Sequence, residues 1–110
     1  MPHIIIEHDQ ETASEIELSK LCHALHKTLS EQETVNLEAI KTRTIEVKNS
    51  IVAKGINNKL LHIEVRLLTG RSESLKEEMA SAIFTRAKEF LSESQCALSV
   101  NISELGVYKK

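Results

Sequence analysis

The chain has 110 residues, of which 41% are hydrophobic and only 3% aromatic, and its formal net charge is −2. A chain of this length forms a single domain, residues 1–110, with a core built mainly from aliphatic side chains. The near-neutral charge, without a run of basic residues, argues against nucleic acid and anionic membranes as partners. The sequence shows no segment apolar enough for a membrane span and no signal-peptide pattern, so we expect a cytoplasmic protein.

The first predicted element is a strand over Pro2–Glu7 that enters the core. Pro2 directly follows Met1, and a small second residue generally permits removal of that methionine. The proline nitrogen would then be a secondary amine, with a reference pKa of about 7.7–8.0 for a terminal amine. Nearby cations and partial burial lower such a pKa towards neutrality, which suits a general base. The alternative is that Pro2 only starts the strand, where its missing N–H has no cost.

The rest of the chain alternates between helical and strand patterns. The capping-box spacing of Thr12–Glu15, followed by apolar residues at helical spacing, predicts a helix over 12–29. β-Branched residues at Ile40–Val47 predict a strand on which Lys41 and Arg43 share one face. After a turn at Lys54–Asn58, the strict alternation of Leu61–Leu67 predicts a second strand.

A second capping box at Ser74–Glu77 begins another predicted helix, whose apolar stripe extends from Leu75 to Leu91. Alternation over 96–102 predicts a closing strand. The elements form two successive β-α-β units, so we expect an α+β fold: a four-stranded sheet with two helices on one face. The other face stays uncovered in one chain, and we expect it to be apolar and therefore to drive self-association.

Several other titratable residues are ambiguous. Cys22 and Cys96 are 74 positions apart and are predicted to be reduced, packed thiols. His23 and His26 have a spacing compatible with metal binding, but without further ligands we interpret them as surface histidines, and we expect no metal site. Two more possibilities depend on strand pairing. His3 and His62 approach one site, and Glu7 and Glu64 form a carboxylate pair, only if their strands are neighbours in register.

Several segments in order and spacing resemble the tautomerase superfamily, and most of all its 5-carboxymethyl-2-hydroxymuconate isomerases. They are Met1-Pro2-His3, Ile40–Arg43, Leu61–Leu67 followed by Gly70-Arg71, and Ala97–Val100. The resemblance implies a trimer of double β-α-β subunits whose sheets face inward. It also implies a cofactor-free isomerase that moves a proton along an unsaturated di- or tricarboxylic keto/enol acid, in the degradation of aromatic acids. Pro2 is then the general base and acid, and Arg43, Arg71 and Lys41 hold substrate carboxylates.

The chain also departs from this pattern. Lys41 stands where related isomerases carry an arginine, and a lysine cannot form the two-pronged contact of a guanidinium. The smaller 4-oxalocrotonate tautomerases use an arginine early in the first helix, where this chain has Glu11 and Glu15. The sequence ends at Lys110, whereas related isomerases extend further. The alternatives are another activity of the superfamily, such as phenylpyruvate tautomerisation or dehalogenation, or a trimeric binding module without catalysis.

Overall fold

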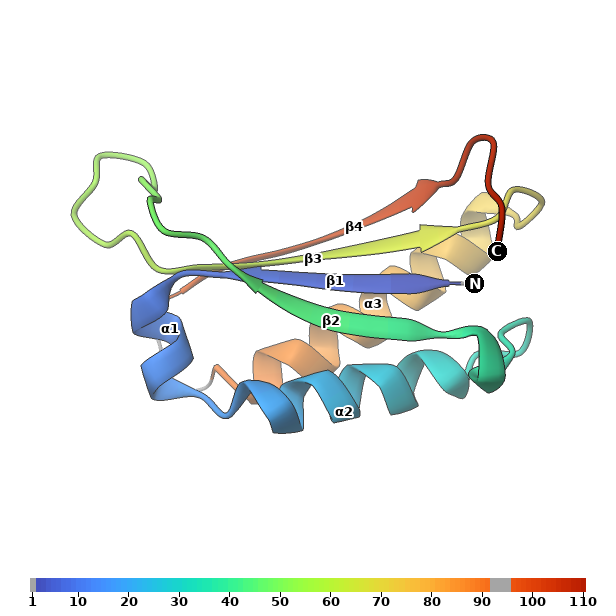
Figure 1. Ribbon diagram of the computed structural model, residues 1–110, viewed down its shortest axis with the longest axis horizontal. Coiled ribbons are helices and arrows are strands. Elements are labelled where there is room, and N and C mark those ends of the chain that lie inside the picture. Colours follow the sequence, from blue (N-terminus) through green and yellow to red (C-terminus); the bar gives the residue numbers. More distant parts are fainter. Residues whose placement is uncertain (1, 92–95) are drawn as a thin grey trace.

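In the computed structural model, which describes residues 2–91 and 96–110, a four-stranded sheet lies against helices on one side (Figure 1). The strands are β1 (His3–His8), β2 (Lys41–Glu46), β3 (Leu60–Leu67) and β4 (Ala97–Glu104). Their order across the sheet is β2-β1-β3-β4. β1 pairs parallel with β2, β3 pairs parallel with β4, and the two central strands β1 and β3 are antiparallel. The two predicted β-α-β units are therefore confirmed, and they meet along β1 and β3.

The helices are α1 (Gln10–Glu15), α2 (Leu18–Ser30) and α3 (Glu73–Glu89), with a 3₁₀ turn, η1 (Leu37–Ala39), before β2. α2 and α3 pack side by side and cover the same face of the sheet, as predicted (Figure 1). Fully buried aliphatic side chains from both layers form the core: Ile4, Ile6, Ile63 and Val65 from the sheet, and Leu21, Leu25, Leu29, Met79 and Ile83 from the helices. Each such side chain contributes about 1.5–3 kcal/mol when it leaves water, so this layer stabilises the fold.

The first helical segment starts and divides differently from the prediction. Asp9 is the N-cap of α1, and its carboxylate accepts hydrogen bonds from the Thr12 N–H at 3.0 Å and from the Thr12 hydroxyl. The same carboxylate accepts from the N–H of Leu60 at 2.9 Å, at the start of β3. Thr12 is fully buried inside α1, so the capping box at Thr12–Glu15 is wrong. Asp9 takes the capping role because its two oxygens satisfy donors from both the helix and the sheet.

The predicted continuous helix over 12–29 is wrong too, because the backbone is extended at Ile16 and Glu17 between α1 and α2. Ile16 and Leu18 pack partly buried against the core on either side of this break. Apolar burial at the end of the sheet thus outweighs the local preference for an unbroken helix.

The second capping box, at Ser74–Glu77, is also wrong. Ser72 has extended backbone angles and its hydroxyl accepts from the Leu75 N–H at 3.1 Å, so α3 begins at Glu73. The apolar stripe itself is confirmed, since Met79, Ile83, Ala87 and Leu91 are buried. A serine caps this helix, as predicted, but it is Ser72 and not Ser74, two residues earlier in the chain.

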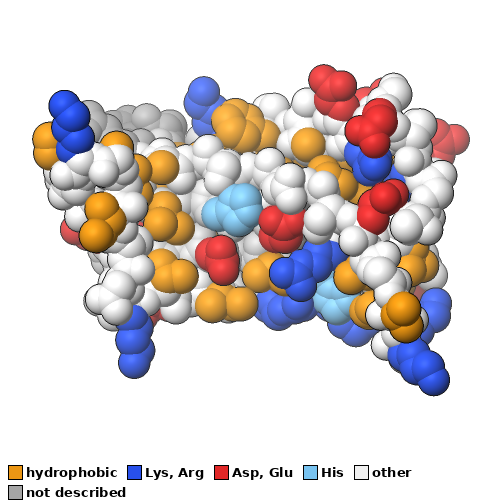
Figure 2. Space-filling model, turned by 90° about the horizontal axis from the view of Figure 1, so that it is seen from above, with side chains coloured by type: hydrophobic (Ala, Val, Ile, Leu, Met, Phe, Trp, Pro, Cys, Tyr) orange, Lys and Arg blue, Asp and Glu red, His pale blue; other side chains and the backbone are white. Residues whose placement is uncertain are grey.

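The open face of the sheet is uncovered in the single chain, as predicted, but it is not apolar. Side chains alternate between faces along each strand, and the fully buried Ile, Leu and Val residues all point to the helices. The open face instead carries mostly polar side chains, in register across the four strands: Lys41, His3, Arg66 and Ser103; then Arg43, Ile5, Glu64 and Asn101; then Ile45, Glu7, His62 and Ser99. Figure 2 shows the resulting mixture of charged, histidine and hydrophobic side chains.

The two cysteines are free thiols, as predicted, and both are partly buried against the core. Burial raises the pKa of the Cys22 and Cys96 thiols. Within the described ranges, no helix has both the length and the apolar character that a membrane crossing requires.

Replacing Asp9 by alanine tests its double role. Asp9→Ala removes the α1 cap and takes away the carboxylate to which the buried Thr12 hydroxyl and the Leu60 N–H donate, so we expect a loss of about 2–4 kcal/mol in the free energy of unfolding. Ser72→Ala is the matched control, since it removes an exposed cap with one hydrogen bond and costs about 1 kcal/mol. Urea denaturation measures both; equal losses would contradict the link between α1 and β3.

Candidate active site

The candidate site lies at the N-terminal end of β1. Pro2 is buried directly before this strand, and its carbonyl oxygen accepts a hydrogen bond from the N–H of Lys41 at 3.0 Å. The next residue, His3, lies between Lys41 on β2 and Arg66 on β3 in the sheet register. Pairing on both sides therefore holds the start of the chain between two strands that each present a cation.

His3 is bonded on both ring nitrogens. Arg43 donates to Nδ1 at 3.0 Å, and Nε2 lies 2.8 Å from the hydroxyl oxygen of Tyr108. The rings of His3 and Tyr108 are also in edge-to-face contact, with centroids 5.6 Å apart and planes at 80°. Tyr108 belongs to the segment after β4, so this segment returns to the N-terminal end of β1 (Figure 1).

The surroundings of His3 disfavour its charged form. Burial is the largest cause that lowers the pKa of His3 below its ordinary value of 6.5, and the positive charges of Arg43, Lys41 and Arg66 add to it. These three cations are exposed, and none forms an ion pair with a carboxylate among the residues that the structure describes. We call Lys41, Arg43 and Arg66 the cation cluster. Unpaired cations beside a buried proline provide a site for an anion such as a carboxylate.

The sheet register places the cation cluster on the open face of the sheet. Figure 2 shows Lys and Arg side chains gathered beside a histidine, on the half of the molecule that in Figure 1 carries the N-terminus. Of the four residues predicted for the site, Pro2, Lys41 and Arg43 come together here, because the N–H of Lys41 bonds to the Pro2 carbonyl oxygen and Arg43 to the adjacent His3.

Arg71 is held differently. Its guanidinium donates to the hydroxyl and the carbonyl oxygen of Thr34, at 2.9 and 3.0 Å, and to the carbonyl oxygen of Leu68 at 3.4 Å. It follows the end of β3, which antiparallel pairing places at the same end of the sheet as His3. In this structure Arg71 fixes the loop before β2, and none of its hydrogen bonds joins it to the cation cluster.

A second polar network lies further along the open face. His62 Nδ1 is 2.6 Å from the Ser99 hydroxyl, and His62 Nε2 is 3.1 Å from the carboxylate of Glu64. Asn101 donates to that carboxylate at 2.8 Å. Burial raises the pKa of Glu64, but hydrogen bonds from Ser103, Asn101 and His62 outweigh it, so the net pKa lies below the ordinary value.

The sheet register decides the two possibilities left open by the sequence. His3 is opposite Arg66, whereas His62 is opposite Glu7, so the two histidines do not share a site. Glu7 and Glu64 are not opposite each other either, because Glu64 is opposite Ile5. Glu7, Glu64 and His62 therefore lie towards the centre of the open face, with Glu64 in the same row as Arg43.

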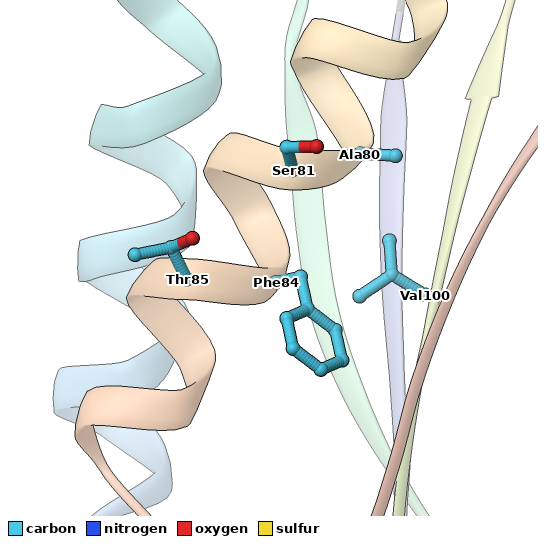
Figure 3. Close-up of a pocket in the computed structure, with 5 residues that line it drawn as sticks. All are labelled: Ala80, Ser81, Phe84, Thr85 and Val100. Atoms are coloured by element: carbon cyan, nitrogen blue, oxygen red, sulfur yellow. The ribbon is translucent and has the colours of Figure 1, made fainter.

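The remaining candidates carry no comparable arrangement. His23 bonds to the carbonyl oxygen of Ser19 and His26 to the hydroxyl of Thr42, through Nδ1 in each case. Over residues 2–91 and 96–110, no three His, Cys, Asp or Glu side chains gather in a possible metal site. A hollow between α3 and β4 is lined by apolar and hydroxyl side chains without a titratable group: Ala80, Ser81, Phe84, Thr85 and Val100 (Figure 3).

Sequence reasoning did not find Arg66 or Tyr108 as site residues, and it gave His3 only a supporting part. Arg66 lies on the same face of β3 as His62 and Glu64. The antiparallel pairing of β1 and β3 places it opposite His3. The local sequence pattern does not predict which strand pairs with β1. For Tyr108 the sequence holds no signal, since its partner is 105 residues away.

The fold of this chain is similar to the folds of known proteins. A 5-carboxymethyl-2-hydroxymuconate delta-isomerase has a similar structure over 100% of this chain and 87% of its own length, with a TM-score of 0.91 and 15% identity. A 5-carboxymethyl-2-hydroxymuconate isomerase from Deinococcus radiodurans R1 matches 99% of this chain and 88% of its own, with a TM-score of 0.86 and 22% identity. A fused 4-OT symmetric trimer matches 94% of this chain and 87% of its own, with a TM-score of 0.72 and 18% identity. No curated protein matches the sequence.

The fold is thus the α+β fold of the tautomerases. The family model described as 5-carboxymethyl-2-hydroxymuconate isomerase matches residues 2–109, and the chain belongs to this family. The protein is accordingly an isomerase.

The electrostatics of the cation cluster can be tested on His3. Because the folded pKa of His3 lies below its ordinary value of 6.5, we expect the neutral form to predominate at pH 6.5, and Arg43→Ala to raise this pKa by removing one of the positive charges that lower it. Protonation then favours the unfolded chain, so the contribution of His3 to stability is complete above pH 6.5 and is lost as the pH falls through the folded value. An NMR titration of the imidazole resonances measures this pKa.

Lys48→Gln, a change on the loop after β2, is the control and should leave the titration of His3 unchanged. A His3 that titrates above 6.5 in the unaltered protein would contradict the electrostatic account.

Proposed function

We propose that the protein isomerises an unsaturated di- or tricarboxylic keto/enol acid, resembling 5-carboxymethyl-2-hydroxymuconate, with Pro2 as general base and acid. The observation that carries the proposal is the buried Pro2 at the end of β1, next to cations without carboxylate partners among the described residues. A place in the breakdown of aromatic acids and a location in the cytoplasm belong to the same proposal, on the strength of the resemblance.

The proton transfer requires removal of Met1, which makes the Pro2 nitrogen a secondary amine. The cations that lower the pKa of His3 also disfavour a protonated amine one residue away. A terminal amine starts from a pKa of about 7.7–8.0, so a modest decrease brings it to neutral pH. At that value the nitrogen takes a proton from one carbon or oxygen of the conjugated acid and returns it to another.

The substrate carboxylates are assigned to Arg43, Lys41 and Arg71. Arg43 offers a planar pair of N–H donors, and as the charge of the dienolate builds on oxygen, fixed cations stabilise it. Lys41 is a point charge, so it attracts a carboxylate without fixing its plane. Arg71 reaches a substrate only if it releases Thr34, which its three hydrogen bonds oppose.

We also propose that three chains assemble through the open faces of their sheets. The structural relatives include a protein described as a symmetric trimer. The open face presents hydrogen-bonding groups that are already paired within the chain, which lowers the cost of removing them from water. In such an assembly the cation cluster of each chain lies close to a neighbouring chain.

The role of Pro2 is tested by substitution. Because a general base contributes about 10²–10⁴-fold, we expect Pro2→Ala to lower kcat/KM by at least about 10²-fold, without a change in the far-ultraviolet circular dichroism spectrum. The measurement follows the ultraviolet absorbance of 5-carboxymethyl-2-hydroxymuconate and of a panel of related keto/enol acids. Lys48→Gln should retain full turnover.

Intact mass of the purified protein decides first whether the amine exists. Retention of Met1 turns the Pro2 nitrogen into an amide without basicity, and the mechanism then fails. Full activity in Pro2→Ala would show that isomerisation, if present, uses another base.

The proposed assembly is tested by sedimentation equilibrium. We expect a mass three times the 12.4 kDa of the chain. Ile5→Asp introduces a charge among Arg43, Glu64 and Glu7 on the open face and should shift the mass towards the single chain. Ser81→Asp, on the exposed side of α3, introduces the same charge away from the open face and should leave the assembly intact. A single-chain mass for the unaltered protein overturns the proposal.

A further inference from the structure

The segment after β4 places one aromatic side chain on the candidate site. The N–H of Leu105 donates to the carbonyl oxygen of Leu67 at 2.7 Å, which carries the pairing of β4 with β3 beyond the strand. Three residues later Tyr108 is partly buried, while its neighbours Val107 and Lys109 are exposed. The tyrosine ring thus packs inward, on His3.

The hydrogen bonds at His3 determine where the protons lie. Arg43 can only donate, so Nδ1 of His3 accepts and carries no proton. A neutral imidazole then carries its single proton on Nε2 and donates it to the hydroxyl oxygen of Tyr108, 2.8 Å away. The low pKa of His3 agrees with this neutral form.

The same bonds decide what the Tyr108 hydroxyl can do. Its oxygen accepts from His3, so its O–H remains available as a donor. Across the described parts of the chain, His3 is the hydrogen-bond partner of this hydroxyl, and no other accepts from it. The Tyr108 hydroxyl is bonded to the histidine that lies between Lys41 and Arg66 and that accepts from Arg43. A tyrosine O–H in such a position is suited to an anionic oxygen, since the cations attract the anion and the O–H adds a directed bond.

We infer that Tyr108 is a substrate-binding residue, which donates its O–H to an oxygen of the acid held by the cation cluster. The inference rests on the proposed function of this site and adds a donor from the far end of the chain. Arg43 has two effects in this arrangement: its charge attracts the acid, and its hydrogen bond to His3 sets the tautomer that leaves the tyrosine proton free. The Arg43 guanidinium therefore attracts the acid and also keeps the Tyr108 O–H free to donate to it.

Tyr108→Phe tests this donor, because it keeps the ring that packs on His3 and removes only the hydroxyl. The probe is cis,cis-muconate, a dicarboxylate that carries no enol, and its Kd is measured by isothermal titration calorimetry. A hydrogen bond to a charged group contributes about 1.5–3 kcal/mol, so we expect the Kd to rise roughly 10-fold or more with an unchanged Tm. Val107→Ala, at the exposed neighbouring residue, is the matched control and should bind as the unaltered protein does.

A purely structural role for Tyr108 gives a different result. If the tyrosine only anchors its segment, Tyr108→Phe leaves the Kd for muconate unchanged, and the inference is overturned. Absence of muconate binding to the unaltered protein overturns it as well. Turnover measured on the same samples separates the two proposals: muconate binding that depends on Tyr108, without isomerisation of any acid in the panel, rejects the proposed function and keeps the inference.

Discussion

Strand β1 is hydrogen-bonded on both sides, and this double pairing determines the geometry of the N-terminal end of the molecule. Ile4 and Ile6 are fully buried against the helices, which fixes the register, because a shift by one residue would turn these side chains to the open face. With the register fixed, His3 must lie between Lys41 and Arg66. Pro2 is held buried at the same point. Pro2 therefore has a fixed position in the fold although it lies close to the start of the chain.

The charges of the open face are unevenly distributed. The cation cluster occupies the end of β1 that carries Pro2, while Glu7 and Glu64 lie towards the centre, where His62 and Asn101 engage Glu64. Glu64 is thus hydrogen-bonded within its own network and forms no ion pair with the cation cluster among the described residues. Like charges close together favour an anionic ligand, and at His3 they add to burial, the largest cause, in lowering the pKa. One arrangement therefore provides a positive potential and favours the neutral form of His3.

The polarity of the open face changes the physical basis of the proposed assembly. An apolar face would associate through the hydrophobic effect alone, without fixing an orientation. A face whose histidine, serine, carboxylate and amide groups are paired within the chain can be buried with fewer unsatisfied groups, and its pattern of donors and acceptors restricts how a second chain fits. Ile5 and Ile45 supply the apolar contacts within that pattern. The charged end of the face then remains near the border between chains.

Local patterns in the amino-acid chain were enough to predict the elements whose signal is periodic: the four strands, the apolar stripes of the helices, and the double β-α-β order. The residues of the resemblance also pointed to Pro2 and Arg43. Packing in three dimensions was needed to establish that Asp9 and Ser72 begin the helices, that the open face is polar, and that Arg66 and Tyr108 meet His3. Periodicity reports which face of an element is buried. Asp9 with Leu60, and His3 with Tyr108, are instead contacts between residues far apart in the chain, set by the antiparallel pairing of β1 with β3 and by the return of the last segment.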